Sequence, residues 1–384
     1  MGFNDLARLY LNKLTAKKDQ VFTYPVEEQK QFLASFPTND DYDRSRSQYL
    51  AQSKLNGVLR SVFFNLICIP VYWKHKIRTA KKKFDLKRKY DLVFHIYNAD
   101  RSLIPESLLQ EFPNHYFSES DNMALNSQDL LFIKDLKQRY PNSYYFISKI
   151  IAKMAIYRAI IQQYQPEAIA TCSEYSFTSS VLTLWLEEQN IEHINFMHGE
   201  KLFYARDSFA RFSRFYVWDN YYVELLSKLY FPKHSFIVEI PPGLKTEHNK
   251  YKNQEIDLIY YLANETAEEL KIIIEAMNIL QQKGMKIKLR GHPRYSDYKY
   301  LEKNCPPGML EENISLEESL SSTKMAASLY STVLQQAYAK GINIVIDDLK
   351  DKKKYQKIIE LEYIMLKRPH MLLSQLITEK VQKE

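Results

Sequence analysis

The segment "EIDLIYYLANETAEELKIIIEAMNILQQKGMKIKLRGHP" (255–293) decides the fold. Its first eleven residues are rich in apolar and aromatic side chains and predict a strand. A helix follows, because Thr266 and Glu269 form a capping-box pattern ahead of an apolar repeat of helical spacing. A second strand is predicted over 286–290. A strand, a helix and a strand in this order predict parallel strands joined by a right-handed crossover.

The same alternation of strands and helices extends through most of the chain. Further strands are expected at 90–100, 168–171, 193–197, 213–218, 236–244, 324–330 and 342–346. The fold class is therefore α/β with parallel sheets, and 384 residues suggest more than one core. We expect three parts. They are a helical basic extension (1–88) that packs on the first domain, a first Rossmann-like domain (89–245) and a second one (246–384). The stretch 36–48, "FPTNDDYDRSRSQ", is expected to be a polar break within the extension.

Composition and missing motifs exclude several classes of protein. The chain is 45% hydrophobic and 26% charged, as in folded globular proteins. It has only 8 glycines and no GxGxxG or GxxxxGK[ST] pattern, which disfavours a dinucleotide site or a P-loop. The absence of HExxH, GxSxG and paired CxxC motifs disfavours zinc peptidases, α/β-hydrolases and zinc ribbons. Three widely spaced cysteines fit a reducing compartment.

A strongly basic segment distinguishes the extension. Residues 74–89, "KHKIRTAKKKFDLKRK", directly follow an apolar stretch at 58–73 that is too short and interrupted to span a bilayer. An apolar stretch followed by a basic one favours a helix that lies on the inner face of an anionic membrane. It is equally compatible with a buried helix followed by a solvated linker. The basic residues also suit an anionic glycan acceptor, through Lys74, Lys76, Arg78, Lys81, Lys82 and Lys83. A nucleic-acid partner is not expected, because no recognised binding signature is present.

Two motifs lie where a strand gives way to a helix. His292 and Pro293 follow the strand 286–290, and Ser331 and Thr332 follow the strand 324–330. Ligands of open parallel sheets bind at the carboxyl ends of strands. An imidazole, together with hydroxyl and N–H groups at a helix start, can bind phosphate oxygens. These two loops therefore predict a phosphate site, although Ser331 also suits an ordinary helix cap and His-Pro an ordinary turn.

The pattern of these motifs resembles a family of enzymes. A strand ending in His-Pro, then Ser-x-x-Ser-Thr opening a helix about 40 residues later, looks like the nucleotide-binding half of bacterial GT-B glycosyltransferases that use CMP-sugars. This family comprises the bacterial sialyl- and polysialyltransferases, together with related 3-deoxy-octulosonate transferases of capsule assembly. His-Pro also marks enzymes that transfer polyol phosphates from CDP-alcohols. The resemblance covers about residues 165–348.

The resemblance implies a set of donor-binding residues. These are His292, Pro293, Arg294, Ser328, Ser331, Thr332, the carboxylate Glu312 and, at the turn between domains, Gly243. No metal or cofactor is expected, because dipoles and side chains stabilise the leaving phosphate in this type of transferase.

The identity of the general base stays open between two loops. The family places an acidic pair before glycine in the first domain, and this chain lacks it. Glu174 at the end of the strand 168–171 is our first choice, and His198 at the end of the strand 193–197 is the second. A histidine in a His-Gly pair, as in "MHGEK", resembles the base of CDP-polyol transferases more closely.

The expected function is the inverting transfer of sialic acid, or a related acidic nonulosonate, from a CMP-sugar to a capsule or surface glycan, with polysialic acid synthesis as one form. His292 is expected to act at the leaving phosphate. The alternatives are a CDP-polyol phosphate transferase, a 3-deoxy-octulosonate transferase, or an inactive GT-B scaffold. A cytoplasmic protein, peripheral on the inner face of the membrane, is expected.

Overall fold

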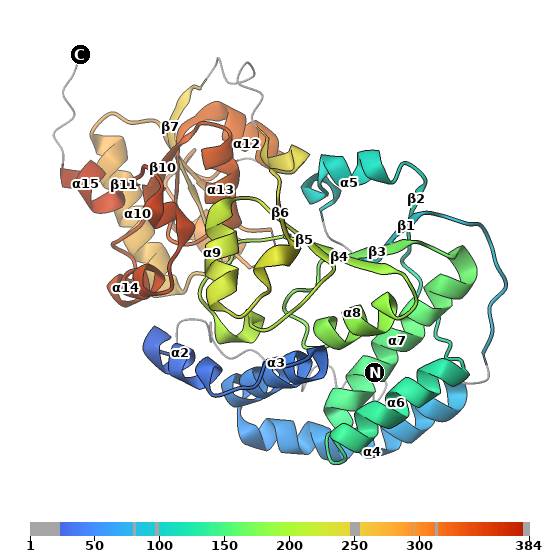
Figure 1. Cartoon of the computed structure of the whole chain (residues 1–384). Coiled ribbons are helices and arrows are strands. Elements are labelled where there is room, and N and C mark those ends of the chain that lie inside the picture. The colour runs from blue at the N-terminus through green and yellow to red at the C-terminus, as the bar shows by residue number, and fades with distance from the viewer. Residues whose placement is uncertain are drawn as a thin grey trace.

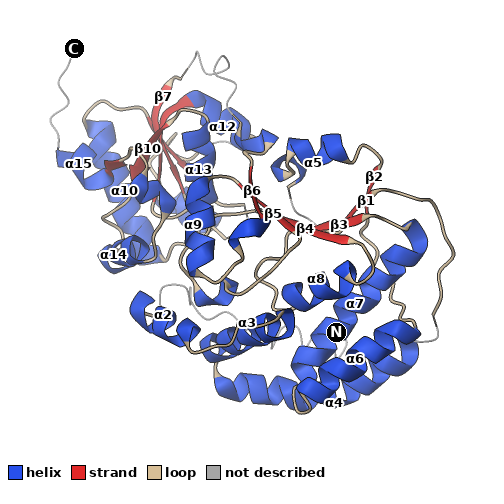
Figure 2. Ribbon diagram, viewed as in Figure 1, coloured by secondary structure: helices blue, strands red, loops and turns tan. Residues whose placement is uncertain are grey.

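The protein is built around two separate parallel sheets. The computed structural model describes residues 24–79, 82–96, 100–245, 254–293, 295–311 and 314–378. The first sheet has the strand order β2 (His115–Phe117), β1 (Leu92–Phe94), β3 (Ala168–Thr171), β4 (Glu192–Phe196), β5 (Arg214–Val217) and β6 (Phe236–Val238). The second has the order β11 (Met371–Leu372), β10 (Asn343–Ile346), β9 (Thr323–Ser328), β7 (Ile256–Tyr261) and β8 (Ile287–Arg290). Figure 2 shows the sheets as two groups of red strands.

Each domain contains helices that alternate with its strands. In the first domain they are α5 (Glu106–Glu111), α6 (Ser127–Arg139), α7 (Tyr144–Tyr164), α8 (Ser179–Glu187) and α9 (Asn220–Lys228). In the second they are α10 (Ala267–Gln282), α11 (Tyr298–Asn304), α12 (Leu316–Ser322), α13 (Thr332–Ala339), α14 (Lys352–Glu360) and α15 (Leu373–Thr378). All described strand pairs are parallel, and chain order reverses between β1 and β3 and between β7 and β9. The expected two-domain α/β architecture of GT-B type is confirmed.

The N-terminal helices pack on the first domain. They are α2 (Val26–Ala34), α3 (Asp41–Asn56) and α4 (Val58–Thr79), and Figure 1 shows them along the lower edge of the molecule. Helix α3 packs on α8, and α4 packs along α7. Within the described residues, we find no helix whose length and hydrophobicity would allow it to cross a bilayer.

The expected polar break at 36–48 is wrong in its second half. Helix α3 begins at Asp41, because the Asp40 carboxylate accepts a hydrogen bond from the Asp43 backbone N–H (2.7 Å). Three of the polar residues that suggested a loop, Ser45, Ser47 and Gln48, are buried, and Ser45 and Gln48 are bonded to the first domain. The Ser45 hydroxyl, for example, accepts from the Val181 N–H (3.0 Å). Their polarity therefore reflects buried hydrogen bonding rather than exposure.

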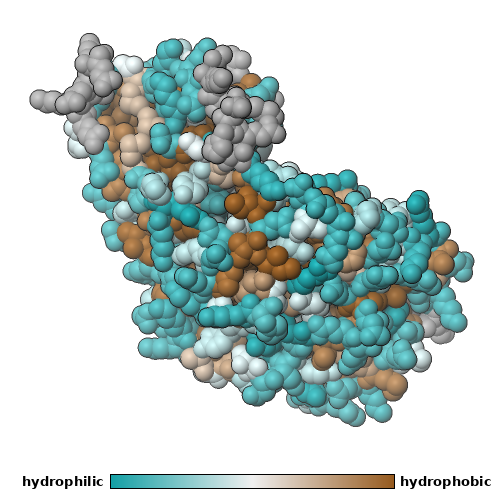
Figure 3. Space-filling model, turned by 45° about the horizontal axis from the view of Figure 1, so that its top comes forward, coloured by the Kyte–Doolittle hydropathy of each residue, from teal (hydrophilic) through white to brown (hydrophobic). Residues whose placement is uncertain are grey.

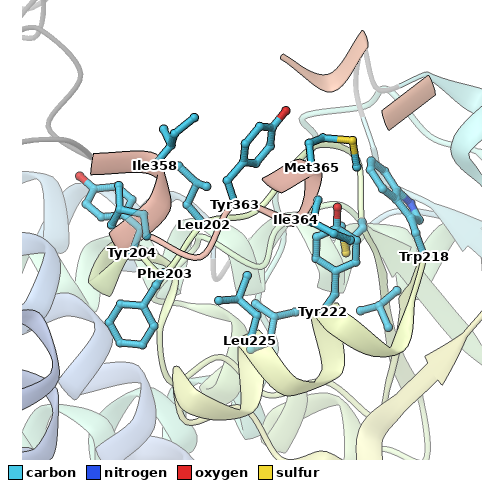
Figure 4. Close-up of a cluster of buried hydrophobic side chains, with 14 of the residues drawn as sticks. Leu202, Phe203, Tyr204, Trp218, Tyr222, Leu225, Ile358, Tyr363, Ile364 and Met365 are labelled. Carbon is cyan, nitrogen blue, oxygen red and sulfur yellow. The ribbon is translucent and has the colours of Figure 1, made fainter. Parts of the chain in front are cut away.

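One hydrophobic cluster extends from the first domain into the second. It includes Phe215 of β5 and Ile259 of β7, together with side chains from α2 and α3. Figure 4 shows part of this cluster, where Tyr222 and Leu225 of α9 approach Tyr363 and its neighbours, from the segment after α14. The surface in Figure 3 is mostly hydrophilic, with hydrophobic side chains gathered near its middle. The two domains thus share a core beneath their cleft.

Candidate active site

A cleft of about 720 Å³ lies where the carboxyl ends of the two sheets meet. The first domain contributes Tyr175, His198, Gly199, Glu200, Lys201 and Arg206. The second contributes Ala263, Asn264, Glu265, Glu269, His292, Tyr295, Leu329, Tyr330, Ser331, Thr332, Lys350 and Lys354. The cleft therefore brings together His198 from the loop after β4, His292 from the loop after β8 and the Ser-Thr pair after β9. This is the position at which open parallel sheets bind ligands.

His198 faces the cleft from the first domain and has a carboxylate behind it. Its Nδ1 lies 3.3 Å from Oε1 of Glu174, and 33% of its side chain is exposed. Because Nδ1 is directed at Glu174, Nε2 on the opposite edge of the ring is left for the cleft. The ring also lies near that of Tyr175, with 6.0 Å between their centroids. A histidine held in this way is suited to accept a proton from a bound hydroxyl.

Glu174 lies beneath His198 and is completely buried. Its carboxylate lies 2.5 Å from Lys201 Nζ and accepts a hydrogen bond from Asn195 Nδ2 (3.2 Å). Burial alone would raise the pKa of Glu174, but Lys201 and His198 outweigh it and hold the pKa well below its usual range. Because it is buried, ionised and absent from the cleft lining, Glu174 is placed to orient His198 rather than to contact a ligand.

Helix α3 holds the loops that carry this pair. Gln48 Nε2 donates to the backbone oxygen of Glu174 (3.2 Å), and Gln52 Nε2 donates to those of Tyr175 (2.7 Å) and Arg206 (3.0 Å). The N-terminal extension therefore supports the site from outside the first domain.

Glu200 lines the cleft and differs from Glu174 in its state of protonation. Its Oε2 accepts a hydrogen bond from the Tyr222 hydroxyl (2.9 Å), whereas its buried Oε1 has no partner among the described residues. Burial raises the pKa of Glu200 from an ordinary 4.5 to about 8, against the lowering effects of Tyr222, Lys201 and Arg368. Glu200 is thus protonated at neutral pH and can donate a hydrogen bond within the cleft.

We expect Glu200→Gln to change the pH dependence of stability. A carboxyl group whose pKa is raised in the folded state contributes stability at low pH that is lost as pH rises through the folded value. From pH 5 to pH 9 the wild type should therefore lose about 4 kcal/mol that the variant keeps. Urea unfolding of both proteins at the two pH values measures this difference. The exposed Glu302→Gln serves as the control, and parallel curves for wild type and Glu200→Gln would contradict an acid of raised pKa.

His292 lines the opposite wall of the cleft on a tightly built turn. Its ring stacks on that of Tyr295, with 4.6 Å between centroids, and its backbone N–H donates to the Ser296 hydroxyl (2.8 Å). The preceding Gly291 is needed here, because a Cβ at that position would lie 2.8 Å from the Tyr298 ring. Pro293 is exposed on the same turn and is not part of the cleft lining.

Ser331 and Thr332 form the start of α13 at the same wall. Ser331 caps the helix, because its hydroxyl accepts from the Val333 N–H (3.2 Å). Its backbone N–H and oxygen both contact the Tyr363 hydroxyl (3.4 and 3.3 Å). Capping and ligand binding are compatible, since the first turn of a helix presents several N–H groups.

The other predicted donor residues are placed differently. Ser328 is fully buried at the end of β9 and does not line the cleft. Gly243 lies in a 3₁₀ turn, Pro242–Leu244, where a Cβ would collide with Ser102 Oγ at 2.3 Å. It therefore permits close packing of two turns rather than access for a nucleotide. Arg294 and Glu312 lie outside the described residues.

Sequence reasoning missed most of the cations in the cleft. Lys201 and Arg206 belong to the loop after β4, and Lys350 and Lys354 follow β10. Lys350 is paired with Glu265 (2.6 Å), and both side chains are buried. The signal was available, because each of these residues follows the carboxyl end of a strand, as His292 does.

Comparison with known proteins gives fold likenesses alone. No family model matches the chain, and no curated protein sequence matches it. Among solved structures, a wall teichoic acid polymerase, TagF, is 12% identical with a TM-score of 0.46, over 83% of this chain and 88% of that one. The UDP-GlcNAc 2-epimerase of Methanocaldococcus jannaschii is 13% identical with a TM-score of 0.45, over 78% and 94%.

A third structure, the glycotransferase of kitacinnamycin, is 9% identical with a TM-score of 0.43, over 77% of this chain and 92% of that one. At such low identities and TM-scores, these likenesses say nothing about the activity of this chain. The fold statement rests on the strand order and the cleft described above.

Proposed function

We propose that the protein is a GT-B transferase that takes a cytidine-nucleotide donor and moves its acidic sugar to a surface glycan. The observation that carries this proposal is the single cleft lined by His198 from one domain and by His292 and Ser331 from the other. A transferase needs a base for the acceptor and a phosphate site for the leaving group, one facing the other. The positions of these residues on opposite walls support the proposal.

In the proposed reaction His198 is the general base. Its Nε2 takes the proton from the acceptor hydroxyl while that oxygen attacks the anomeric carbon of the donor. The bond from this carbon to the phosphate oxygen breaks, and CMP leaves with the electron pair. The charge of Glu174 stabilises the imidazolium that forms, since it lies 3.3 Å from Nδ1. This reverses our first choice of base from the sequence, because Glu174 lies buried behind the histidine.

His292, Ser331 and the N–H groups of α13 are assigned to the phosphate of the nucleotide. Lys350 and Lys354 lie on the same wall, where Lys350 is paired with Glu265. That no metal is required stays a prediction, and so does an anionic glycan acceptor.

A second candidate is transfer of a polyol phosphate from a CDP-alcohol. The observation in its favour is that the base is a histidine in a His-Gly pair, with its carboxylate buried behind it. In that reaction the acceptor oxygen attacks the distal phosphorus, CMP again leaves, and His198 again takes the proton. Hydrolysis of CMP-sialic acid against that of CDP-glycerol distinguishes the two donors.

The first test is a thermal-shift screen with CMP, CDP, UDP and GDP. We expect cytidine nucleotides to stabilise the protein, by about 2.7 kcal/mol at 100 times the dissociation constant. His292→Ala should weaken this binding by about 10- to 100-fold, because a charge-assisted hydrogen bond is lost. The exposed His234→Ala, outside the cleft, should bind as the wild type does. Stabilisation by UDP or GDP alone would overturn the choice of donor, and binding of no nucleotide would favour an inactive scaffold.

A further inference from the structure

Helix α4 carries an exposed face made of large apolar side chains. This apolar face consists of Val62, Phe63, Leu66, Ile67, Ile69 and Trp73, all from consecutive turns of one helix. Leu66 is 60% exposed and Phe63 is 56% exposed. No charged residue occurs between positions 61 and 73. Single exposed apolar residues need no explanation, but a continuous row of them marks a contact surface.

The opposite side of α4 fixes its orientation through polar contacts. Asn65 points inward, where its Nδ2 donates to the Asn142 backbone oxygen (2.6 Å) and its Oδ1 accepts from the Tyr145 N–H (3.1 Å). Tyr72 is also on this side, with only 3% of its surface exposed. The helix thus turns an amide toward the protein and its apolar row outward, the reverse of an ordinary amphipathic surface helix. Rotation to hide the row would break both hydrogen bonds of Asn65.

A basic segment follows the helix closely in the chain. Lys82, Lys83, Lys87, Arg88 and Lys89 are all exposed, and Asp85 is the one acid among them. The segment is fixed to the end of α7, because the Phe84 N–H donates to Gln162 Oε1 (3.1 Å) and the Lys87 N–H donates to the Gln163 backbone oxygen (2.9 Å). These fixed, exposed cations follow the apolar helix in the chain, and the two together suit a layer that is apolar inside and negatively charged outside.

From these observations we propose that α4 lies on the surface of an anionic lipid bilayer, with its apolar face at the boundary of the acyl chains. A helix of this kind inserts side chains without spanning, and the basic residues that follow it bind the anionic headgroups. Trp73, at the end of the row nearest the basic segment, is the residue type that prefers this interface.

The experiment is flotation of the full chain with vesicles. We expect binding to vesicles of phosphatidylglycerol mixed with phosphatidylcholine, and much weaker binding to phosphatidylcholine alone. The double variant Leu66→Asp with Ile67→Asp should reduce binding to the anionic vesicles by about tenfold or more. The matched control is Ile272→Asp with Ile279→Asp, two residues of α10 exposed to 39% and 40%. It should bind as the wild type does.

A charge variant tests the second half of the proposal. Lys82→Glu with Lys83→Glu should lower binding to anionic vesicles by about tenfold and leave the weak binding to phosphatidylcholine unchanged. Unchanged circular dichroism and melting of each variant establish that the fold is intact.

If the wild type does not float, the proposal is wrong. The remaining candidates for covering the face are then a second copy of the chain and residues 1–23 of the same chain. Sedimentation at several concentrations then identifies a dimer. The readout is binding alone, so the result does not depend on the proposed activity.

Discussion

Replacing His198 with alanine is expected to lower the rate of transfer by about 10²- to 10⁴-fold, the usual contribution of a positioned general base. Affinity for the nucleotide should change little, because the donor phosphate is assigned to the other wall of the cleft. Steady-state rates with the donor that the nucleotide screen selects measure the loss, and thermal shift measures the affinity. A variant that keeps activity within a few-fold of the wild type would rule out His198 as the base.

The pH dependence of the rate gives a sharper form of this test. Glu174→Gln keeps the shape of the side chain but removes the charge that stabilises the imidazolium, so it should lower the rate less than His198→Ala does. It should also change the pH dependence of the rate, because the negative charge 3.3 Å from His198 Nδ1 is removed. A role for Glu174 in packing alone would leave the profile where it is. His234→Ala, with its histidine outside the cleft, controls for the loss of an exposed imidazole.

Glu174→Ala is expected to destabilise the fold by about 3 to 5 kcal/mol, because it leaves the Lys201 ammonium buried without its partner. Burial would lower the pKa of Lys201, but Glu174 and Asp207 raise it above its ordinary value in the wild type. Urea unfolding at neutral pH measures the change in free energy.

Two further variants separate the buried pair from other effects of the substitution. The double variant Glu174→Leu with Lys201→Met should recover most of the lost stability, since replacing both ions removes the unpaired charge. Glu106→Ala breaks an exposed ion pair with Lys245 and should leave stability unchanged. Equal losses from Glu174→Ala and the double variant would mean that packing, rather than charge, stabilises this site.

The fold could be predicted from the sequence where the local pattern and the final environment agree. The strand 168–171 and the helix predicted from the capping box of Thr266 and Glu269 match β3 and α10, because the apolar residues of both become core. The edge strands β2 and β11 have three and two residues, too few for any repeat to show. The polar sequence of α3 led to a wrong prediction of a loop, because Ser45, Ser47 and Gln48 are buried in the structure.

The site could be predicted at the level of loops but not of roles. The sequence predicted that three residues follow strand ends, namely His198, His292 and Ser331, and the cleft brings them together. The sequence could not show which of Glu174 and His198 faces the cleft, since this depends on which of two neighbouring loops covers the other. Nor could the protonated state of Glu200 be expected, because it follows from burial that no local pattern encodes.

The apolar cluster beneath the cleft has a consequence for how this chain can be divided. Side chains from α2, from β5 and α9, and from the segment after α14 share one interior. Separating the chain between residues 245 and 254 would expose that interior to water on both halves. Neither domain would therefore be stable on its own. The two walls of the cleft therefore depend on one shared core, and exchanging one wall between related proteins would require matching aromatic side chains in that core.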